Sequence, residues 1–206
     1  MDKVRFFLRE SWLLIVASGV FGLLLAVTNA AWQDRIEANR RQKFESRAAA
    51  LLPQADAFVE MDPIHVELGG GKTDTVQVRK AVREPDQTCV GWAFAAKGSG
   101  FADKIELVLA VDPAFETLRG FAVLSSNETP GFGDKIKNAY YQDQFKGAPA
   151  ETLTLVKTGE PATIDDQIVA ISGATVSSQA VVDIINGYIG AVRDAMQTKG
   201  WINDGR

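Results

Sequence analysis

The sequence predicts an α+β protein, in which a single N-terminal transmembrane helix precedes a mixed, mostly antiparallel sheet domain with packed helices. Three observations predict this class. An uncharged apolar run covers residues 11–33, several short runs with strand character follow it, and a long amphipathic helix comes last. A chain of 206 residues has room for one globular domain and an anchoring segment. Strands that alternate with a few helices suit a sheet covered by helices.

The apolar run is long enough to cross a bilayer as a helix. Residues 11–32 are mostly Leu, Val, Ala, Gly and Phe, with Trp12 and Trp32 near the two ends. About 20 such residues span the roughly 30 Å of hydrocarbon, and tryptophan suits both membrane interfaces. We therefore expect a transmembrane helix over residues 11–32.

A cleaved signal peptide is the alternative interpretation of this segment. Lys3, Arg5 and Arg9 form a basic start, and Thr-Asn-Ala at 28–30 is an acceptable cleavage site. The apolar run is longer than the hydrophobic part of most signal peptides, which favours a retained anchor. Basic residues lie on both sides of the run, so charge alone does not orient it.

The remaining chain predicts a second helical segment and then the globular domain. Residues 33–52 are rich in Ala, Arg, Glu and Gln and stop at Pro53, which predicts a juxtamembrane helix. Residues 53–206 form the domain. We expect its strands at 75–79, 92–96, 105–111, 120–124 and 152–156, and its helices to begin near Asp134, near Asp165 or Asp166, and at Val176.

Several kinds of site are excluded by the residues present. Cys89 is the only cysteine, so an internal disulfide or a Cys-rich iron–sulfur site is not expected. His65 is the only histidine, which argues against zinc, haem and Ser–His–Asp catalysis. The Gly-Gly-Gly-Lys-Thr run at 69–73 lacks the first glycine of a phosphate-binding loop and precedes a strand, so it predicts a hairpin turn. The net charge of −4 gives no reason to expect nucleic acid as a partner.

A small, hydroxyl-rich turn precedes the last helix. Residues 172–178 are Ser-Gly-Ala-Thr-Val-Ser-Ser, and the helix that follows has one apolar face formed by Val181, Ile185, Tyr188, Val192 and Met196. The free N–H groups and the dipole of a helix start stabilise an anion. The pattern is also typical of an ordinary Ser/Thr N-cap, and it does not name the anion.

Three blocks of the sequence resemble one known family. Ile-Ser-Gly-Ala-Thr at 171–175 resembles the flavinylation motif of the FMN-binding domain shared by the G subunit of the Rnf electron transport complex and the C subunit of the sodium-pumping NADH:quinone reductase. Asn-Glu-Thr-Pro-Gly-Phe-Gly-Asp-Lys-Ile at 127–136 resembles the family segment that lies against the bound flavin. A weaker match runs over 91–112. Together the blocks cover roughly residues 90–190 in the family's order, close to half of the chain.

The resemblance implies the site residues. It makes Thr175 the residue that carries FMN through a phosphoester bond. The other residues that it places at the cofactor are Ser172, Gly173, Ala174, Ser177, Glu128, Thr129, Gly131, Phe132, Gly133 and Phe101. Gly131 and Gly133 permit a close approach of the backbone to a flat ring, and the charge of Glu128 is suited to tuning the flavin potential. One departure is Val169, which stands where the family often has an Asp that helps the flavin transferase to recognise its target.

The resemblance also implies a function. The chain would be a membrane-anchored flavoprotein subunit of an Rnf-type ion-translocating complex, an electron relay that is not catalytic alone. Its partners would be the membrane, the other membrane subunits and a flavin transferase. Residues 1–10 would be cytoplasmic, and the domain would lie on the periplasmic or outer face of the inner (plasma) membrane. Three alternatives remain open: a C-type subunit of a Na⁺-translocating quinone reductase, a membrane-tethered binding domain without covalent flavin, and a solitary FMN-binding reductase or sensor.

Overall fold

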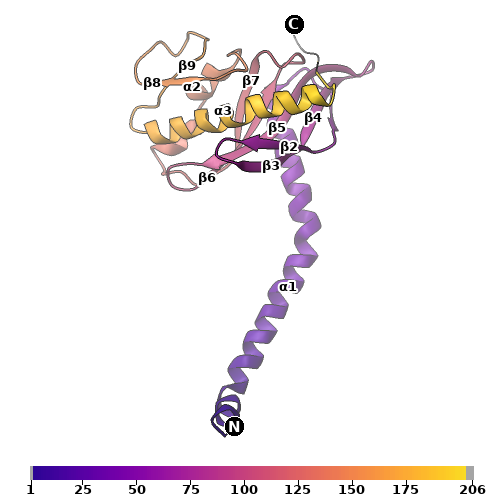
Figure 1. Ribbon diagram of the computed structural model, residues 1–206, viewed down its shortest axis with the longest axis vertical. Coiled ribbons are helices and arrows are strands. Elements are labelled where there is room, and N and C mark those ends of the chain that lie inside the picture. The colour runs from indigo at the N-terminus through magenta and orange to yellow at the C-terminus, as the bar shows by residue number, and fades with distance from the viewer. Residues whose placement is uncertain (1, 203–206) are drawn as a thin grey trace. The chain divides into compact units, whose positions relative to one another are not determined.

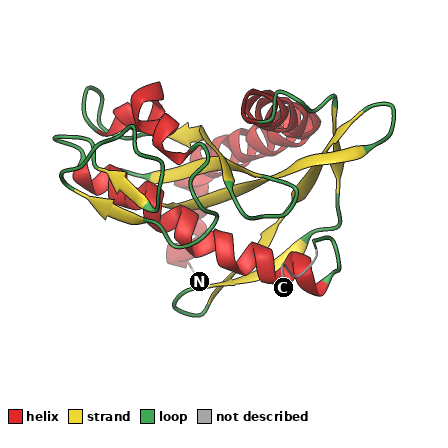
Figure 2. Cartoon of the chain, turned by 90° about the horizontal axis from the view of Figure 1, so that it is seen from above, coloured by secondary structure: helices red, strands yellow, loops and turns green. Residues whose placement is uncertain are grey.

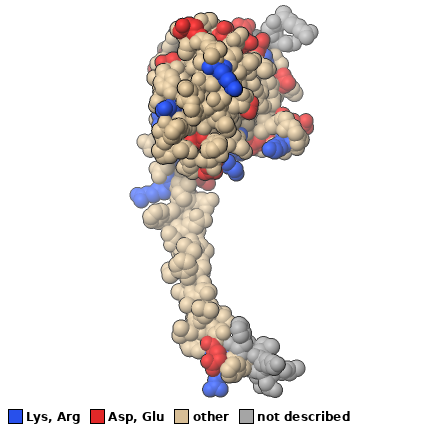
Figure 3. Space-filling view, turned by 90° about the vertical axis from the view of Figure 1, so that its left-hand side faces the viewer, with Lys and Arg blue, Asp and Glu red and all other residues tan. Residues whose placement is uncertain are grey.

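The computed structural model describes residues 2–202, and the chain divides into two compact units between Gln42 and Lys43. One helix, α1 (Asp2–Leu51), begins in the first unit and ends in the second (Figure 1). By length and composition, α1 is apolar enough to cross a membrane. Its middle exposes large apolar side chains, including Leu23, Leu24 and Leu25, and the face in Figure 3 shows no charged residue there. α1 ends two residues before Pro53.

The second unit is built on a five-stranded antiparallel sheet with the strand order β1-β4-β5-β6-β7. Its strands are β1 (Ala57–Glu60), β4 (Val78–Arg83), β5 (Thr88–Ser99), β6 (Lys104–Val111) and β7 (Leu118–Ser126). A separate antiparallel hairpin consists of β2 (Ile64–Leu68) and β3 (Lys72–Val76), and a short parallel pair consists of β8 (Thr154–Val156) and β9 (Gln167–Val169). The predicted α+β class is confirmed.

Different helices cover the two faces of the sheet (Figures 1 and 2). α3 (Thr175–Thr198) packs on one face, where its buried residues join the main hydrophobic core with the inward side chains of β5 and β6. The last turns of α1 pack on the other face through Phe44 and Ala48, and Leu52, the residue after the helix, continues the same four-residue spacing. Successive strand residues point to opposite faces, so β5 and β6 contribute to both cores.

The helical predictions are confirmed in part. The five apolar residues predicted for one face of the last helix, Val181, Ile185, Tyr188, Val192 and Met196, are all at most 2% exposed. The helix predicted near Asp134 is the short 3-10 helix η1 (Gly133–Lys137). It is followed by α2 (Ala139–Gln142) and η2 (Asp143–Phe145), whose Tyr141 and Phe145 pack edge to face against Phe121 of β7.

Two expected elements differ in the structure. No helix begins at Asp165 or Asp166, because the Asp165 carboxylate accepts the N–H of Gln167 in a local turn and the chain continues as β9. The strand predicted over 75–79 is interrupted at Gln77, so its halves belong to β3 and β4 in different sheets. The hairpin turn predicted at 69–73 is confirmed, since it joins β2 to β3.

Tyr188 ties α3 to the β2–β3 hairpin. Its hydroxyl donates to Asp74 Oδ2 at 2.6 Å, and Lys97 Nζ donates to Asp74 Oδ1 at 3.0 Å. Burial raises the pKa of Asp74, but the hydrogen bonds from Tyr188 and Lys97, the charge of Lys97 and the N–H of Thr75 together outweigh burial and hold the pKa below its ordinary value. We expect Tyr188→Phe to lower the free energy of unfolding by about 1–3 kcal/mol at pH 7, because it removes a hydrogen bond to a charged group.

The effect of Tyr188→Phe should depend on pH. A carboxyl with a lowered folded-state pKa adds stability above its unfolded pKa of about 4, and this stability is lost as the pH falls through the folded-state value. The difference between wild type and Tyr188→Phe should therefore be smaller at pH 3 than at pH 7 in urea unfolding of the full chain in detergent. Tyr140→Phe, at an exposed position, is the control. Equal differences at both pH values would contradict the role of Asp74.

Candidate functional site

The turn before α3 presents Thr175 at the surface. α3 begins at Thr175, and its N-cap position is held by Ala174, with no capping hydrogen bond from a side chain. An ordinary Ser/Thr N-cap is therefore not formed. Gly173 has φ +80, which glycine adopts without strain and which turns the chain into the helix. Ser172, Thr175 and Val176 are exposed, so the Thr175 side chain stands in solvent at the positive end of a helix.

Ser178 fixes the conformation of this turn through hydrogen bonds to its backbone. Its hydroxyl accepts the N–H of Ile171 at 3.1 Å and donates to the carbonyl of Ala174 at 3.0 Å. The Tyr141 hydroxyl in turn donates to the carbonyl of Ser178 at 3.0 Å. Ser178 is fully buried, so these bonds are shielded from water. The backbone before Thr175 is thus fixed at both ends of the turn.

A buried carboxylate connects three separate segments beneath Thr175. Glu128 is 4% exposed, and its Oε1 accepts the N–H of Ala102 at 3.0 Å while its Oε2 accepts the hydroxyl of Ser177. These contacts join the β5–β6 loop, the loop after β7 and the first turn of α3. Within the described chain Glu128 forms no salt bridge with a Lys or Arg, and its partner Ser177 lies in the first turn of α3, at the positive end of the helix dipole. Glu128 and Ser177, both predicted site residues, are brought together here.

Two glycines make room for this carboxylate. A Cβ at Gly133 would lie 2.5 Å from Ser177 Oγ and 2.7 Å from Glu128 Oε2, and a Cβ at Gly100 would overlap Glu128 Oε1. Gly133 therefore permits the approach of Glu128 and Ser177. Gly131, in contrast, is exposed at φ +79 with open space where a Cβ would be. The open space at Gly131 still permits the predicted close approach of the backbone to a flat ring.

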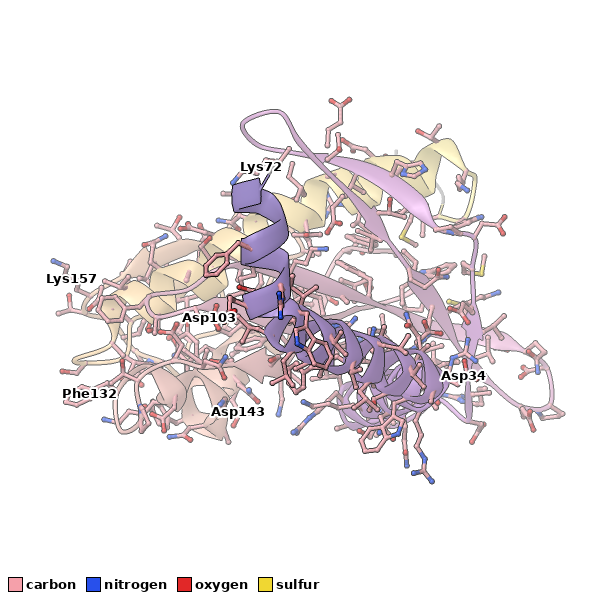
Figure 4. All side chains as sticks on the ribbon, turned by 90° about the horizontal axis from the view of Figure 1, so that it is seen from below. Asp34, Lys72, Asp103, Phe132, Asp143 and Lys157 are labelled. Carbon is pink, nitrogen blue, oxygen red and sulfur yellow. The ribbon has the colours of Figure 1, made fainter. Side chains whose placement is uncertain are left out.

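Three exposed apolar side chains lie on the segments that meet at Glu128, and we call them the apolar rim: Phe101, Phe132 and Val176. They are 66%, 56% and 57% exposed, respectively. Each is next in sequence to a residue that contacts or crowds the Glu128 carboxylate, so the rim gathers side chains from three segments. The Phe132 ring lies against Gly173, and Figure 4 shows Phe132 at the end of the domain where α3 begins. The rim is therefore a candidate binding surface.

The structure adds three residues to the predicted site and shows the exposure of two predicted ones. Val176 joins the rim, Ser178 holds the turn, and Gly100 adjoins Glu128; these three were absent from the predicted cofactor contacts. Thr129 is exposed, and its carbonyl accepts the N–H groups of Phe132 and Asp134 at 3.2 and 3.3 Å, which closes the loop. Ala174 is mostly buried, at 7% exposed.

Gly133→Ala should disturb the site from inside the fold. The added methyl group would meet the buried Ser177–Glu128 pair, and we expect a loss of about 1–3 kcal/mol in the free energy of unfolding because overpacking forces these groups apart. Gly187→Ala is the matched control, since it lies in α3 with open space around it and should stabilise by about 0.5–1 kcal/mol. Chemical denaturation of the three proteins tests this. A Gly133→Ala protein as stable as wild type would show that the pair is not tightly packed.

Comparisons with known proteins agree with this arrangement. A family model for the FMN-binding domain matches residues 100–190, which contain the whole site. The crystal structure of NqrC from Shewanella oneidensis shares the fold, with a TM-score of 0.55 at 23% identity over 71% of this chain and 70% of that one. Residues 100–190 are thus similar to an FMN-binding domain, and the domain shares its fold with NqrC.

The relatives define the family more narrowly. The G subunit of the ion-translocating oxidoreductase complex of Methanosarcina acetivorans is 31% identical, over 85% of this chain and 89% of its own length. The G subunit of the Na⁺-translocating ferredoxin:NAD⁺ oxidoreductase complex of Acetobacterium woodii is 28% identical, over 84% and 86%. This chain belongs to the family formed by the G subunits of ion-translocating oxidoreductase complexes. The resemblance seen in the three sequence blocks is confirmed.

Proposed function

We propose that the chain is the membrane-anchored electron-transfer subunit of an Rnf-type ion-translocating complex, with FMN joined to Thr175 by a phosphoester bond. The observation that carries this proposal is the placement of Thr175: an exposed hydroxyl on the first residue of a helix that has no side-chain cap, behind a turn fixed by Ser178. A phosphate on this hydroxyl lies in the field of the helix N-terminus, which stabilises its charge.

The surrounding residues suit a tethered flavin. When bound, FMN supplies the ability to accept and donate electrons one at a time. The apolar rim offers aromatic and aliphatic surface to a flat ring, and the exposed loop at Gly131 lets backbone approach it. A covalent tether keeps the cofactor on the domain even where the ring is open to solvent, and an open ring can exchange electrons with neighbouring centres.

The family and the long apolar helix support the rest of the proposal. Both relatives named above are subunits of complexes, and the chain matches nearly their whole lengths, which favours the G subunit of an Rnf-type complex over the C-type subunit of a quinone reductase. Residues 11–32 of α1 anchor the chain in the inner (plasma) membrane, with residues 1–10 cytoplasmic and the domain on the outer face. The partners are the other membrane subunits, and a flavin transferase attaches the FMN.

In-gel fluorescence tests the covalent flavin. The full chain is coexpressed with a flavin transferase, separated on a denaturing gel and viewed under ultraviolet light. We expect a fluorescent band, and mass mapping should place the added group on the peptide that contains Thr175. A dark band, in cells that flavinylate a known target alongside, would reject the covalent attachment and leave a noncovalent FMN-binding domain.

A further inference from the structure

A polar groove lies beside β7, within the unit formed by residues 43–206, and the flavin proposal does not use it. Its volume is about 330 Å³. One wall consists of five consecutive β7 residues, 122–126, and the other walls come from three helices. The helical lining residues are Lys43 and Arg47 of α1, Lys137 of η1 and Gln142 of α2.

The β7 wall of the groove is a sheet edge. β7 is the last strand of the five-stranded sheet and pairs with β6 on one side. Its first residue is covered on the other side, where Leu118 exchanges hydrogen bonds with Ala148 and Gly147 at 2.8 and 2.7 Å. On this second side, away from β6, no described strand pairs with residues 122–126. The Ser126 carbonyl accepts a hydrogen bond from Lys137 Nζ at 3.3 Å, so this backbone group already faces the groove.

The charge of the groove has one sign. Lys43, Arg47 and Lys137 line it from two different helices, all three are exposed, and none of the described lining residues is acidic. The domain as a whole is not basic, since the chain carries a net charge of −4. Three cations beside an open strand edge therefore form a local feature that complements carboxylates.

We propose that this groove binds an acidic, extended segment of a partner protein, which adds as a strand to the edge of β7. The five lining residues give about 17 Å of strand edge at roughly 3.4 Å per residue, enough for a short peptide strand. Backbone hydrogen bonds to the edge supply affinity, and carboxylates on alternate residues pair with the three cations. A lipid headgroup would satisfy the cations but would leave the strand edge unused, so a peptide fits the groove better.

A labelled peptide tests the proposal on the full chain in nanodiscs of neutral phospholipid. The probe is a fluorescent peptide of alternating glutamate and valine, about eight residues long, to cover the edge with overhang. We expect saturable binding in fluorescence anisotropy. Lys43→Glu and Arg47→Glu should each weaken it at least about tenfold, because each replaces a charge-assisted contact by repulsion. Lys72→Glu, an exposed charge reversal on the β2–β3 hairpin, should bind as wild type does.

Two further probes separate strand addition from simple charge attraction. The same peptide with N-methylated valines keeps every carboxylate but loses the valine N–H donors, and it should bind at least about tenfold more weakly. Equal binding of the methylated peptide, or no saturable binding of the parent peptide, would overturn the proposal. The proposal would also be overturned if anionic lipid in the nanodisc fully inhibited peptide binding and Arg47→Glu lost the binding of that lipid. The groove would then be a site for a lipid headgroup.

Discussion

Thr175→Ala is expected to abolish the covalent flavin and leave the fold intact. The Thr175 side chain is exposed and makes no hydrogen bond to the part of the chain that the structure describes, so its loss removes no internal contact. Alanine is a good helix former at this position, and the free energy of unfolding should change by no more than about 0.5 kcal/mol. In-gel fluorescence after coexpression with the transferase should fall to background, while thermal unfolding of the domain stays unchanged.

Two control variants make this result specific to the Thr175 oxygen. Thr175→Ser keeps a hydroxyl at the same helix position and should retain fluorescence. Ser172→Ala removes the other exposed hydroxyl of the turn and should leave fluorescence at the wild-type level. Ser177 and Ser178 are 3% and 0% exposed, so neither is accessible as an attachment residue in the folded domain. If the Thr175→Ala band stays fluorescent and turns dark only when Ser172 is also replaced, Ser172 is the attachment residue.

The burial of the Ser177 and Ser178 hydroxyls could be predicted from the sequence. The apolar face defined by Val181 and Ile185 continues one turn back to Ser177 and Ser178, while Val176 falls outside it. Helical periodicity therefore predicts two buried serines and one exposed valine, as the structure shows. It does not predict their partners. Glu128 lies 49 residues from Ser177 in sequence, and only the packed fold brings the two together.

The fold shows the same division between local and long-range information. Amphipathic α3 was predictable because its side-chain period is sustained over many residues, and strands β5 to β7 were predictable because each contains a run of mainly apolar residues. The break at Gln77 was not, because residues on both sides have strand character and the choice of sheet depends on distant partners. At Asp165 a side-chain hydrogen bond to the backbone of Gln167 decided against a helix, although aspartate there also fits a helix start.

Glu128→Ala is expected to be the most destabilising single change at the site. It leaves the buried hydroxyl of Ser177 and the half-buried N–H of Ala102 without their acceptor. At about 1–3 kcal/mol for each unsatisfied donor, the free energy of unfolding should fall by about 2–6 kcal/mol. Chemical denaturation measures this, and flavinylation should fall with it because the first turn of α3 loses its support. Glu106→Ala on the partly exposed side of β6 is the control and should change the stability little.

Glu128→Gln separates the charge of this residue from its shape. Glutamine fills the same space between Gly100 and Gly133, its amide oxygen can accept from Ala102, and its NH₂ can donate to the Ser177 hydroxyl, which then acts as the acceptor. The domain should therefore stay folded and flavinylated. Removing a negative charge near the cofactor makes added electrons less unfavourable, so the flavin potential should rise by on the order of tens of millivolts in a spectroelectrochemical titration. An unchanged potential in a fully flavinylated Glu128→Gln protein would restrict Glu128 to holding the three segments together.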